Sequence, residues 1–146
     1  MPAPDEARAA SLLAGYLLAR GWTVRLAGES QVEARRDGEQ LALEPVLDAA
    51  GLDRVIVTRR WAVAAGAAPA ALEALALELN ERLNVGQFRA APDALEFQAS
   101  LAFLDTLEPR LLDAFLAYTA EVGLAVRRVE GDRGLLAPVE SGPGSR

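Results

Sequence analysis

The side chains available for catalysis are limited, because the chain contains neither histidine nor cysteine. Acyl transfer needs a nucleophile beside a base, and the usual pairings use one of these two residue types. Serine occurs at positions 11, 30, 100, 141 and 145, in each case outside a nucleophile-elbow motif. We therefore expect no catalytic residues and a protein that is not an enzyme.

Carboxylates are the remaining candidates for acid–base or metal chemistry. Glu33 with Glu44, or Glu96 with a neighbour across a sheet, would lie on one face of paired strands, where solvated carboxylates opposite arginines are the preferred interpretation. The segment EGDRG, at 130–134, is a single acidic turn without the repeated oxygen ligands of a calcium loop. No phosphate-binding glycine loop follows a predicted strand. We expect no metal, no cofactor and no small-molecule substrate.

Every positively charged side chain is arginine, and three pairs are adjacent, at 35–36, 59–60 and 127–128. Neighbouring residues of a strand point to opposite faces, so each pair gives one arginine to a given surface. The residues that could share an exposed sheet face, and bind phosphates or acidic peptide there, are Arg25, Arg35, Arg60 and Arg89. Acidic residues on the same face favour ion pairs instead. The net charge of -6 opposes nonspecific nucleic-acid binding.

Composition is typical of one globular domain, with 146 residues of which 51% are hydrophobic. No apolar run reaches the roughly 20 residues of a membrane span, and the N-terminus is acidic where a signal peptide is basic. We expect a cytoplasmic protein, and the richness in alanine and arginine is typical of a GC-rich bacterial genome. Residues 1–137 are predicted to form the domain, and 138–146 a flexible tail.

The first half of the chain reads as one helix followed by strands. A helix is predicted over 5–20 with Gly21 after its end, followed by a strand over 22–26. Asp37-Gly38 predicts a two-residue hairpin turn between strands at 32–36 and 40–44. The β-branched run 54–63 is a further strand that carries Arg59 on its apolar face. We expect Arg59 to lie at the end of the sheet or to pair with a carboxylate, because an unpaired buried guanidinium is very costly.

The second half contains two helices around a hairpin. A helix over 69–84 begins at Pro69 and carries more apolar residues than its own sheet requires. The surplus strip and its polar neighbours form the predicted dimer or partner interface: Ala70, Ala74, Leu77, Asn80 and Asn84. Strands follow from Phe88 and over 95–103, and a third helix is predicted over 108–122, ended by Gly123. Residues 124–139 form either a short hairpin or a segment along the sheet edge.

The predicted fold is α+β, an antiparallel sheet of five or six strands with helices on one face, in the order α-β-β-β-α-β-β-α. The stretch ELNERLNVGQF leads into a hairpin whose second strand is ALEFQASLAFL. With this order of elements over 5–122, the chain resembles the bacterial YbjN family, whose fold is that of the type III secretion chaperones. The resemblance implies a non-enzymatic, chaperone-like module, usually dimeric, that binds a protein client or regulatory protein, with a role in stress response or regulation. A nucleic-acid-associated regulatory factor is the alternative.

Overall fold

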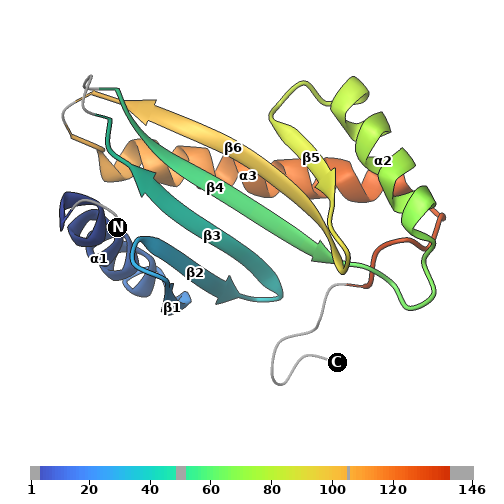
Figure 1. Ribbon diagram of the computed structural model, residues 1–146, viewed down its shortest axis with the longest axis horizontal. Coiled ribbons are helices and arrows are strands. Elements are labelled where there is room, and N and C mark those ends of the chain that lie inside the picture. Colours follow the sequence, from blue (N-terminus) through green and yellow to red (C-terminus); the bar gives the residue numbers. More distant parts are fainter. Residues whose placement is uncertain (1–3, 49–51, 105, 139–146) are drawn as a thin grey trace.

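A computed structural model describes residues 4–48, 52–104 and 106–138 and confirms the predicted α+β class (Figure 1). Six antiparallel strands form one open sheet, in the order β1-β2-β3-β4-β6-β5. The elements are α1 (Pro4–Leu18), β1 (Thr23–Ala27), β2 (Gln31–Arg36), β3 (Glu39–Val46), β4 (Asp53–Ala62), α2 (Pro69–Arg82), β5 (Gln87–Ala90), β6 (Ala94–Phe103) and α3 (Pro109–Glu130). Four strands therefore precede α2, and two follow it.

The turn between β2 and β3 is the one that the sequence predicts. Asp37 and Gly38 both adopt positive φ angles, 51° and 81°, as a two-residue turn of type I′ requires. This turn sets the register, in which Arg36 pairs with Glu39 and Ala34 with Leu41. Because the side-chain period of a strand is two, the register decides which residues of β2 and β3 face the helices.

All three helices pack on the same face of the sheet. One core cluster joins α1 and the first half of α3 to β2, β3 and β4, through Leu17, Leu43, Val57 and Leu112 among others. A second cluster joins α2 and the second half of α3 to β5 and β6. Phe97 is fully buried in the second cluster, and burying a side chain of this size contributes about 1.5–3 kcal/mol. The opposite face of the sheet carries no helix among the described residues and is largely polar.

The third helix is longer than the sequence analysis predicts. Gly123 was expected to follow its end, but α3 continues through it to Glu130. The reason is that Val122 and Val126 continue the buried stripe of the helix over the second core cluster, so tertiary packing outweighs the weak helix propensity of one glycine. Gly131, with φ of 59°, is the residue that ends α3. The pair at 127–128, predicted beside strand signals, accordingly lies on this helix.

Residues 131–138, the described part of the segment after α3, form no hairpin of their own. Their backbone lies along the end of β4, where Leu136 forms an isolated bridge with Val63 and the N–H of Ala137 donates to the carbonyl of Ala62 over 2.8 Å. The carboxylate of Glu130 accepts hydrogen bonds from the N–H groups of Leu135 and Leu136, at 2.8 and 3.1 Å. A buried carboxylate thus fixes this segment, and sequence analysis had left its structure open. The predicted tail lies outside the described residues beyond Pro138.

Candidate functional site

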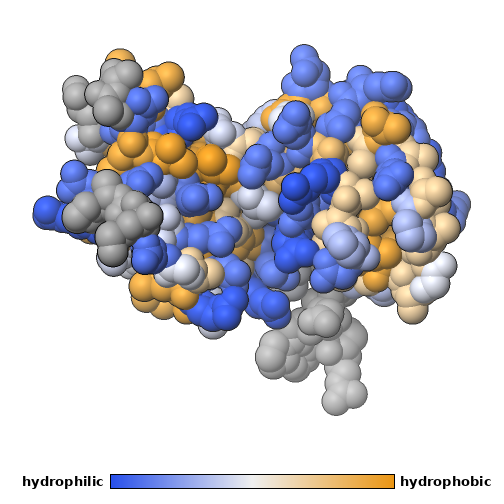
Figure 2. Space-filling view, viewed as in Figure 1, coloured by the Kyte–Doolittle hydropathy of each residue, from blue (hydrophilic) through white to orange (hydrophobic). Residues whose placement is uncertain are grey.

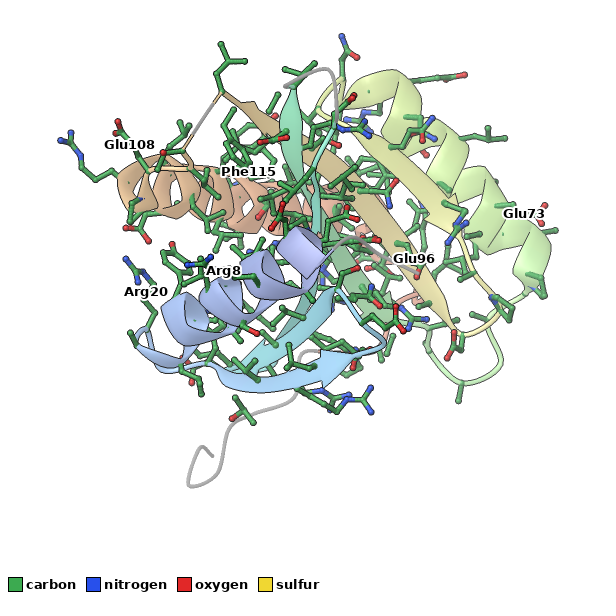
Figure 3. The ribbon with its side chains drawn as sticks, turned by 60° about the vertical axis from the view of Figure 1, so that its left-hand side comes forward. Arg8, Arg20, Glu73, Glu96, Glu108 and Phe115 are labelled. Atoms are coloured by element: carbon green, nitrogen blue, oxygen red, sulfur yellow. The ribbon has the colours of Figure 1, made fainter. Side chains whose placement is uncertain are left out.

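The surplus apolar strip of α2 is exposed, as the sequence predicts. Ala70, Ala74 and Leu77 all lie on the solvent side of the helix, and 65% of Leu77 is accessible. Figure 3 shows Glu73, from the same helix, projecting away from the sheet. Leu72, Leu75, Ala76 and Leu79 are buried on the other side. The strip is therefore accessible to a partner.

Asn80, predicted as part of that interface, has a role within the chain. Its side-chain N–H₂ donates to the carbonyl of Phe88 over 2.9 Å, and its side-chain oxygen accepts from the N–H of Phe88 over 2.8 Å. The carboxamide thereby replaces one peptide unit of a neighbouring strand and covers part of the outer edge of β5. Asn84 is exposed and makes no such contact with the described residues.

The four arginines predicted to share the open face of the sheet do share it. Arg25 pairs with Glu33, and Glu96 accepts from Arg89 while lying 3.1 Å from the Nε of Arg60. Arg60 also contacts Asp93 over 3.0 Å. The preferred interpretation of this face, carboxylates paired with arginines, is confirmed for these residues. Arg35 differs, because it pairs with no carboxylate within the described part of the chain.

A second exposed feature lies at the end of β6. β5 pairs with β6 only from Leu95 to Gln98, so the rest of β6 has no strand on its outer side among residues 4–48, 52–104 and 106–138. Because Asn80 binds the outer N–H and C=O of Phe88, the backbone of Gln98 must face β5. The two-residue period then directs the N–H and C=O of Ser100 and Ala102 outward. Figure 2 shows the molecule indented here, between the end of β6 and the loop after α2.

Apolar side chains of α3 accompany this free edge. Leu111 and Tyr118 are 44% and 43% accessible. They lie on the same side of the helix as Phe115, each about one turn away from it. Phe115 and Leu101 of β6 both pack against the first core cluster, and the ring of Phe115 stacks on Tyr118 with 6.4 Å between centroids. Helical periodicity alone would place all three residues on the inner face of α3, yet Leu111 and Tyr118 are exposed. The sequence does contain a signal of this exposure, because the apolar residues of the helix extend over a wider arc than one sheet can cover.

Arg59 is buried, with 5% of its surface accessible, and it is fully engaged. Its Nε donates to the hydroxyl of Thr119 over 2.9 Å, and its Nη2 donates to the carbonyl of Leu116 over 3.2 Å. Its Nη1 lies 3.4 Å from a carboxylate oxygen of Glu39. Burial lowers the pKa of the Arg59 guanidinium, the Glu39 carboxylate raises it, and the nearby Arg36 lowers it again. The expected pairing with a carboxylate is confirmed, and so is the strand register.

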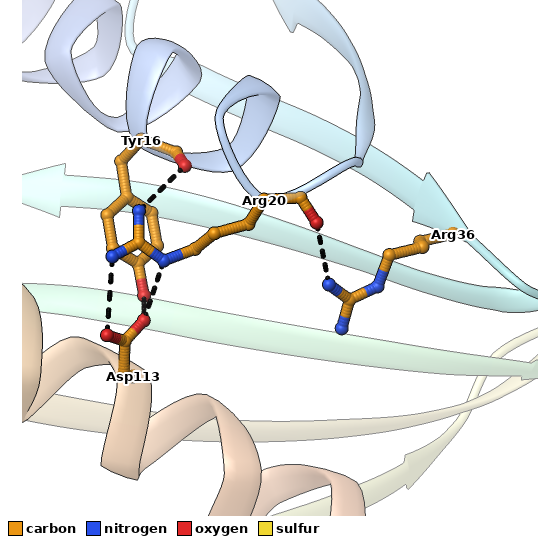
Figure 4. A network of polar contacts seen from close by, with 4 residues as sticks. All are labelled: Tyr16, Arg20, Arg36 and Asp113. Carbon is orange, nitrogen blue, oxygen red and sulfur yellow. Dashed lines mark hydrogen bonds and ion pairs between the residues drawn. The ribbon is translucent and has the colours of Figure 1, made fainter.

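A polar network connects α1 to α3 (Figure 4). Arg20 donates to both carboxylate oxygens of Asp113, over 2.8 and 3.3 Å, and its guanidinium lies 3.6 Å from the centre of the Tyr16 ring. The hydroxyl of Tyr16 also donates to Asp113. The hydrogen bonds from Arg20 and Tyr16 lower the pKa of Asp113, and burial together with the Asp113 contact raises the pKa of Tyr16. The carboxylate is thus held ionised, which suits a structural contact better than proton transfer.

Within the described residues, acidic side chains form no cluster able to hold a metal ion. Nor does any helix in this part of the chain have the length and apolar content needed to cross a membrane.

Comparison with known proteins gives no identification: no family model, no curated protein and no solved structure matches this chain. The resemblance to the YbjN family therefore stays a prediction, and the geometry described above carries the functional argument.

Proposed function

We propose that this protein is a non-enzymatic, chaperone-like or adaptor module of the bacterial cytoplasm that binds an extended segment of a protein partner. The observation that carries this proposal is the free outer edge of β6 beside exposed apolar side chains of α3. Ser100 and Ala102 offer outward N–H and C=O groups, while Leu111 and Tyr118 offer apolar contacts next to them. An extended peptide that pairs with a sheet edge and places alternate side chains in an adjacent groove uses this combination.

The edges of β5 and β1 are less suited to strand pairing than the free edge of β6. Natural sheets cover or charge their edges, and here the carboxamide of Asn80 covers β5 at Phe88. The end of β6 has no equivalent cover among the described residues. The free edge of β6 also lies beside hydrophobic side chains, whereas the edge strand β1 carries the ion-paired Arg25 on its open face. These differences favour β6 over the other edges as the place where a partner strand pairs.

The test blocks strand addition while leaving the fold intact. Ala102→Pro removes an outward N–H that no strand of the described residues uses, and proline is tolerated at such edge positions. Ala102→Val keeps the N–H and serves as the matched control. The wild type and both variants are immobilised, and proteins retained from a host-cell extract at high salt are quantified by mass spectrometry. We expect proteins that the wild type and Ala102→Val retain in equal amounts, and that Ala102→Pro loses.

Equal retention by Ala102→Pro and Ala102→Val would contradict strand addition at β6. Retention that disappears between low and moderate salt would instead support the alternative function, a nucleic-acid-associated factor, because phosphate contacts are strongly salt-dependent. That alternative has less support here, since Arg25, Arg60 and Arg89 already contact carboxylates.

We also propose that the protein is a homodimer formed through the exposed strip of α2. Small residues at Ala70 and Ala74 beside Leu77 let a second helix approach closely. Leu77→Glu places a charge in this strip and none in the core, so we expect a change from dimer to monomer in light scattering with unchanged circular dichroism. A wild type that is already monomeric at high micromolar concentration would refute this interface.

A further inference from the structure

A cleft lies at the end of the sheet where β2 turns into β3, at the opposite end of β4 from the free edge of β6. Its volume is about 690 Å³, and its walls come from the β2–β3 turn, the end of β4, the second half of α3 and the segment at 137–138. We name it the arginine cleft after the residues that line it: Arg35, Arg36, Arg59, Arg60 and Arg127, with Trp61. In Figure 2, strongly hydrophilic residues gather around the β2–β3 turn.

The charges of the cleft do not balance. Five arginines line it against two carboxylates, Asp37 and Glu39, and Arg60 already pairs with Asp93 and Glu96 outside the cleft. The other four arginines leave a surplus of two positive charges, in a chain whose net charge is -6. Arg60 is neutralised by carboxylates of the open sheet face, and among the described residues Arg59 pairs with one carboxylate, that of Glu39, at 3.4 Å. The surplus is therefore local to the cleft and is not a property of the whole surface.

Three of these arginines, Arg35, Arg36 and Arg127, have guanidinium groups without a carboxylate partner in the described part of the chain. The Nη1 of Arg127 donates to the carbonyl of Ala137 over 2.9 Å. Arg36 is held in place by neutral contacts: its Nη1 donates to the carbonyl of Arg20 over 2.9 Å, and its guanidinium lies 4.3 Å from the centre of the Trp22 ring. Arg35 is exposed at the mouth of the cleft. The charge of Arg36 also lowers the pKa of the buried Arg59. Placing like charges together in this way costs stability, and a bound anion would offset that cost.

We propose that the arginine cleft binds a small molecule that carries two or more phosphate groups. A surplus of two positive charges suits a polyanion, and planar guanidinium groups donate paired hydrogen bonds to phosphate oxygens. The volume of the cleft falls within the roughly 300–1,000 Å³ that small-molecule sites occupy. The buried Arg59, fixed by Thr119 and Leu116, gives the cleft a rigid floor. This inference is independent of strand pairing at β6.

The tryptophans provide the readout. Trp61 lines the cleft, Trp22 lies under Arg36, and these two are the only tryptophans of the chain. Pyrophosphate and tripolyphosphate are titrated into the full chain at constant ionic strength, followed by tryptophan fluorescence and by calorimetry. Citrate provides a carboxylate polyanion, and an oligothymidine without terminal phosphates provides the phosphates of nucleic acid. We expect saturable binding of tripolyphosphate, weaker binding of pyrophosphate, and at least about tenfold weaker binding of citrate.

Variants locate the binding site. Arg35→Gln removes an exposed guanidinium that makes no ion pair with the described residues, and Arg36→Gln removes the one that stacks on Trp22. Each should weaken tripolyphosphate binding by at least about tenfold, since each would lose a charge-assisted hydrogen bond. Arg54→Gln, at the other end of β4 and outside the cleft, makes the same charge change and should bind like the wild type.

Three results would overturn the proposal: no saturable binding of either phosphate compound, equal weakening by Arg35→Gln and Arg54→Gln, or citrate binding as tight as that of tripolyphosphate. Tighter binding of the oligothymidine than of tripolyphosphate would likewise overturn it in favour of a nucleic-acid site. Arg35→Gln keeps the test valid if Arg36→Gln fails to fold.

Discussion

Asn80 provides the sharpest test of how α2 holds the edge of the sheet. Asn80→Ala removes the two hydrogen bonds to the backbone of Phe88, at 2.9 and 2.8 Å. Each neutral hydrogen bond contributes about 0.5–1.5 kcal/mol, which gives a loss of about 1–3 kcal/mol for the pair. Alanine is the better helix former by at most about 0.7 kcal/mol, and this offsets part of the loss. We therefore expect a net decrease of about 0.3–2.3 kcal/mol in the free energy of unfolding.

Asn80→Asp distinguishes the contributions of the two hydrogen bonds to stability. A carboxylate still accepts from the N–H of Phe88, but it cannot donate to the carbonyl and instead places an oxygen against it. A negative charge near the C-terminal end of α2 is also unfavourable, because the carbonyl dipoles of the helix point there. This variant should therefore lose at least as much stability as Asn80→Ala at neutral pH. The difference should shrink at acidic pH, where a protonated carboxyl can donate.

The assay is urea denaturation followed by circular dichroism, with Asn84→Ala as the matched control. Asn84 is an exposed asparagine just beyond the end of α2, without a hydrogen bond to the described residues. Its replacement should change stability by less than about 0.5 kcal/mol. Equal effects of Asn80→Ala and Asn84→Ala would refute the structural role of Asn80 and would return it to the predicted interface.

Three further results are expected from the same denaturation assay. Phe97→Ala should cost about 3–5 kcal/mol because it leaves a cavity in the core, whereas Gln98→Ala on the open face should cost little; the reverse order would exchange the two faces of β6. Arg59→Met should leave stability within about 1 kcal/mol of the wild type or raise it, because the half-exposed Glu39 stays solvated; a loss above about 3 kcal/mol would contradict this. The pKa of Asp113 is lowered in the folded state, so its contribution is present above about pH 4 and lost as the pH falls further; Asp113→Asn should differ from the wild type at neutral pH, and a difference that persisted in acid would refute the assignment.

Local sequence determined the elements and much of the register. The positive φ angles that Asp37 and Gly38 supply, the proline at the start of α2 and the strict alternation from Leu95 to Phe103 act over a few residues, so they are visible without the tertiary structure. The register then placed Arg25, Arg35, Arg60 and Arg89 on one face, as predicted. The predicted end of α3 was wrong because that end is set by tertiary packing and not by local sequence. The packing of Val126 in the second core cluster outweighed the helix-ending signal of Gly123.

The polar contacts between helices and strands depend on residues far apart in the chain. Arg59 and Thr119 are 60 positions apart in the sequence, and Arg20 and Asp113 are 93 apart, so no local pattern predicts either hydrogen bond. Asn80 was correctly singled out, yet only the folded chain brings its carboxamide to the edge of β5 rather than to a partner. The arginine cleft likewise exists only because the β2–β3 turn, β4 and α3 converge at one end of the sheet. Sequence determines which charges are present, and the fold decides which of them are neutralised by neighbours and which are left to bind something else.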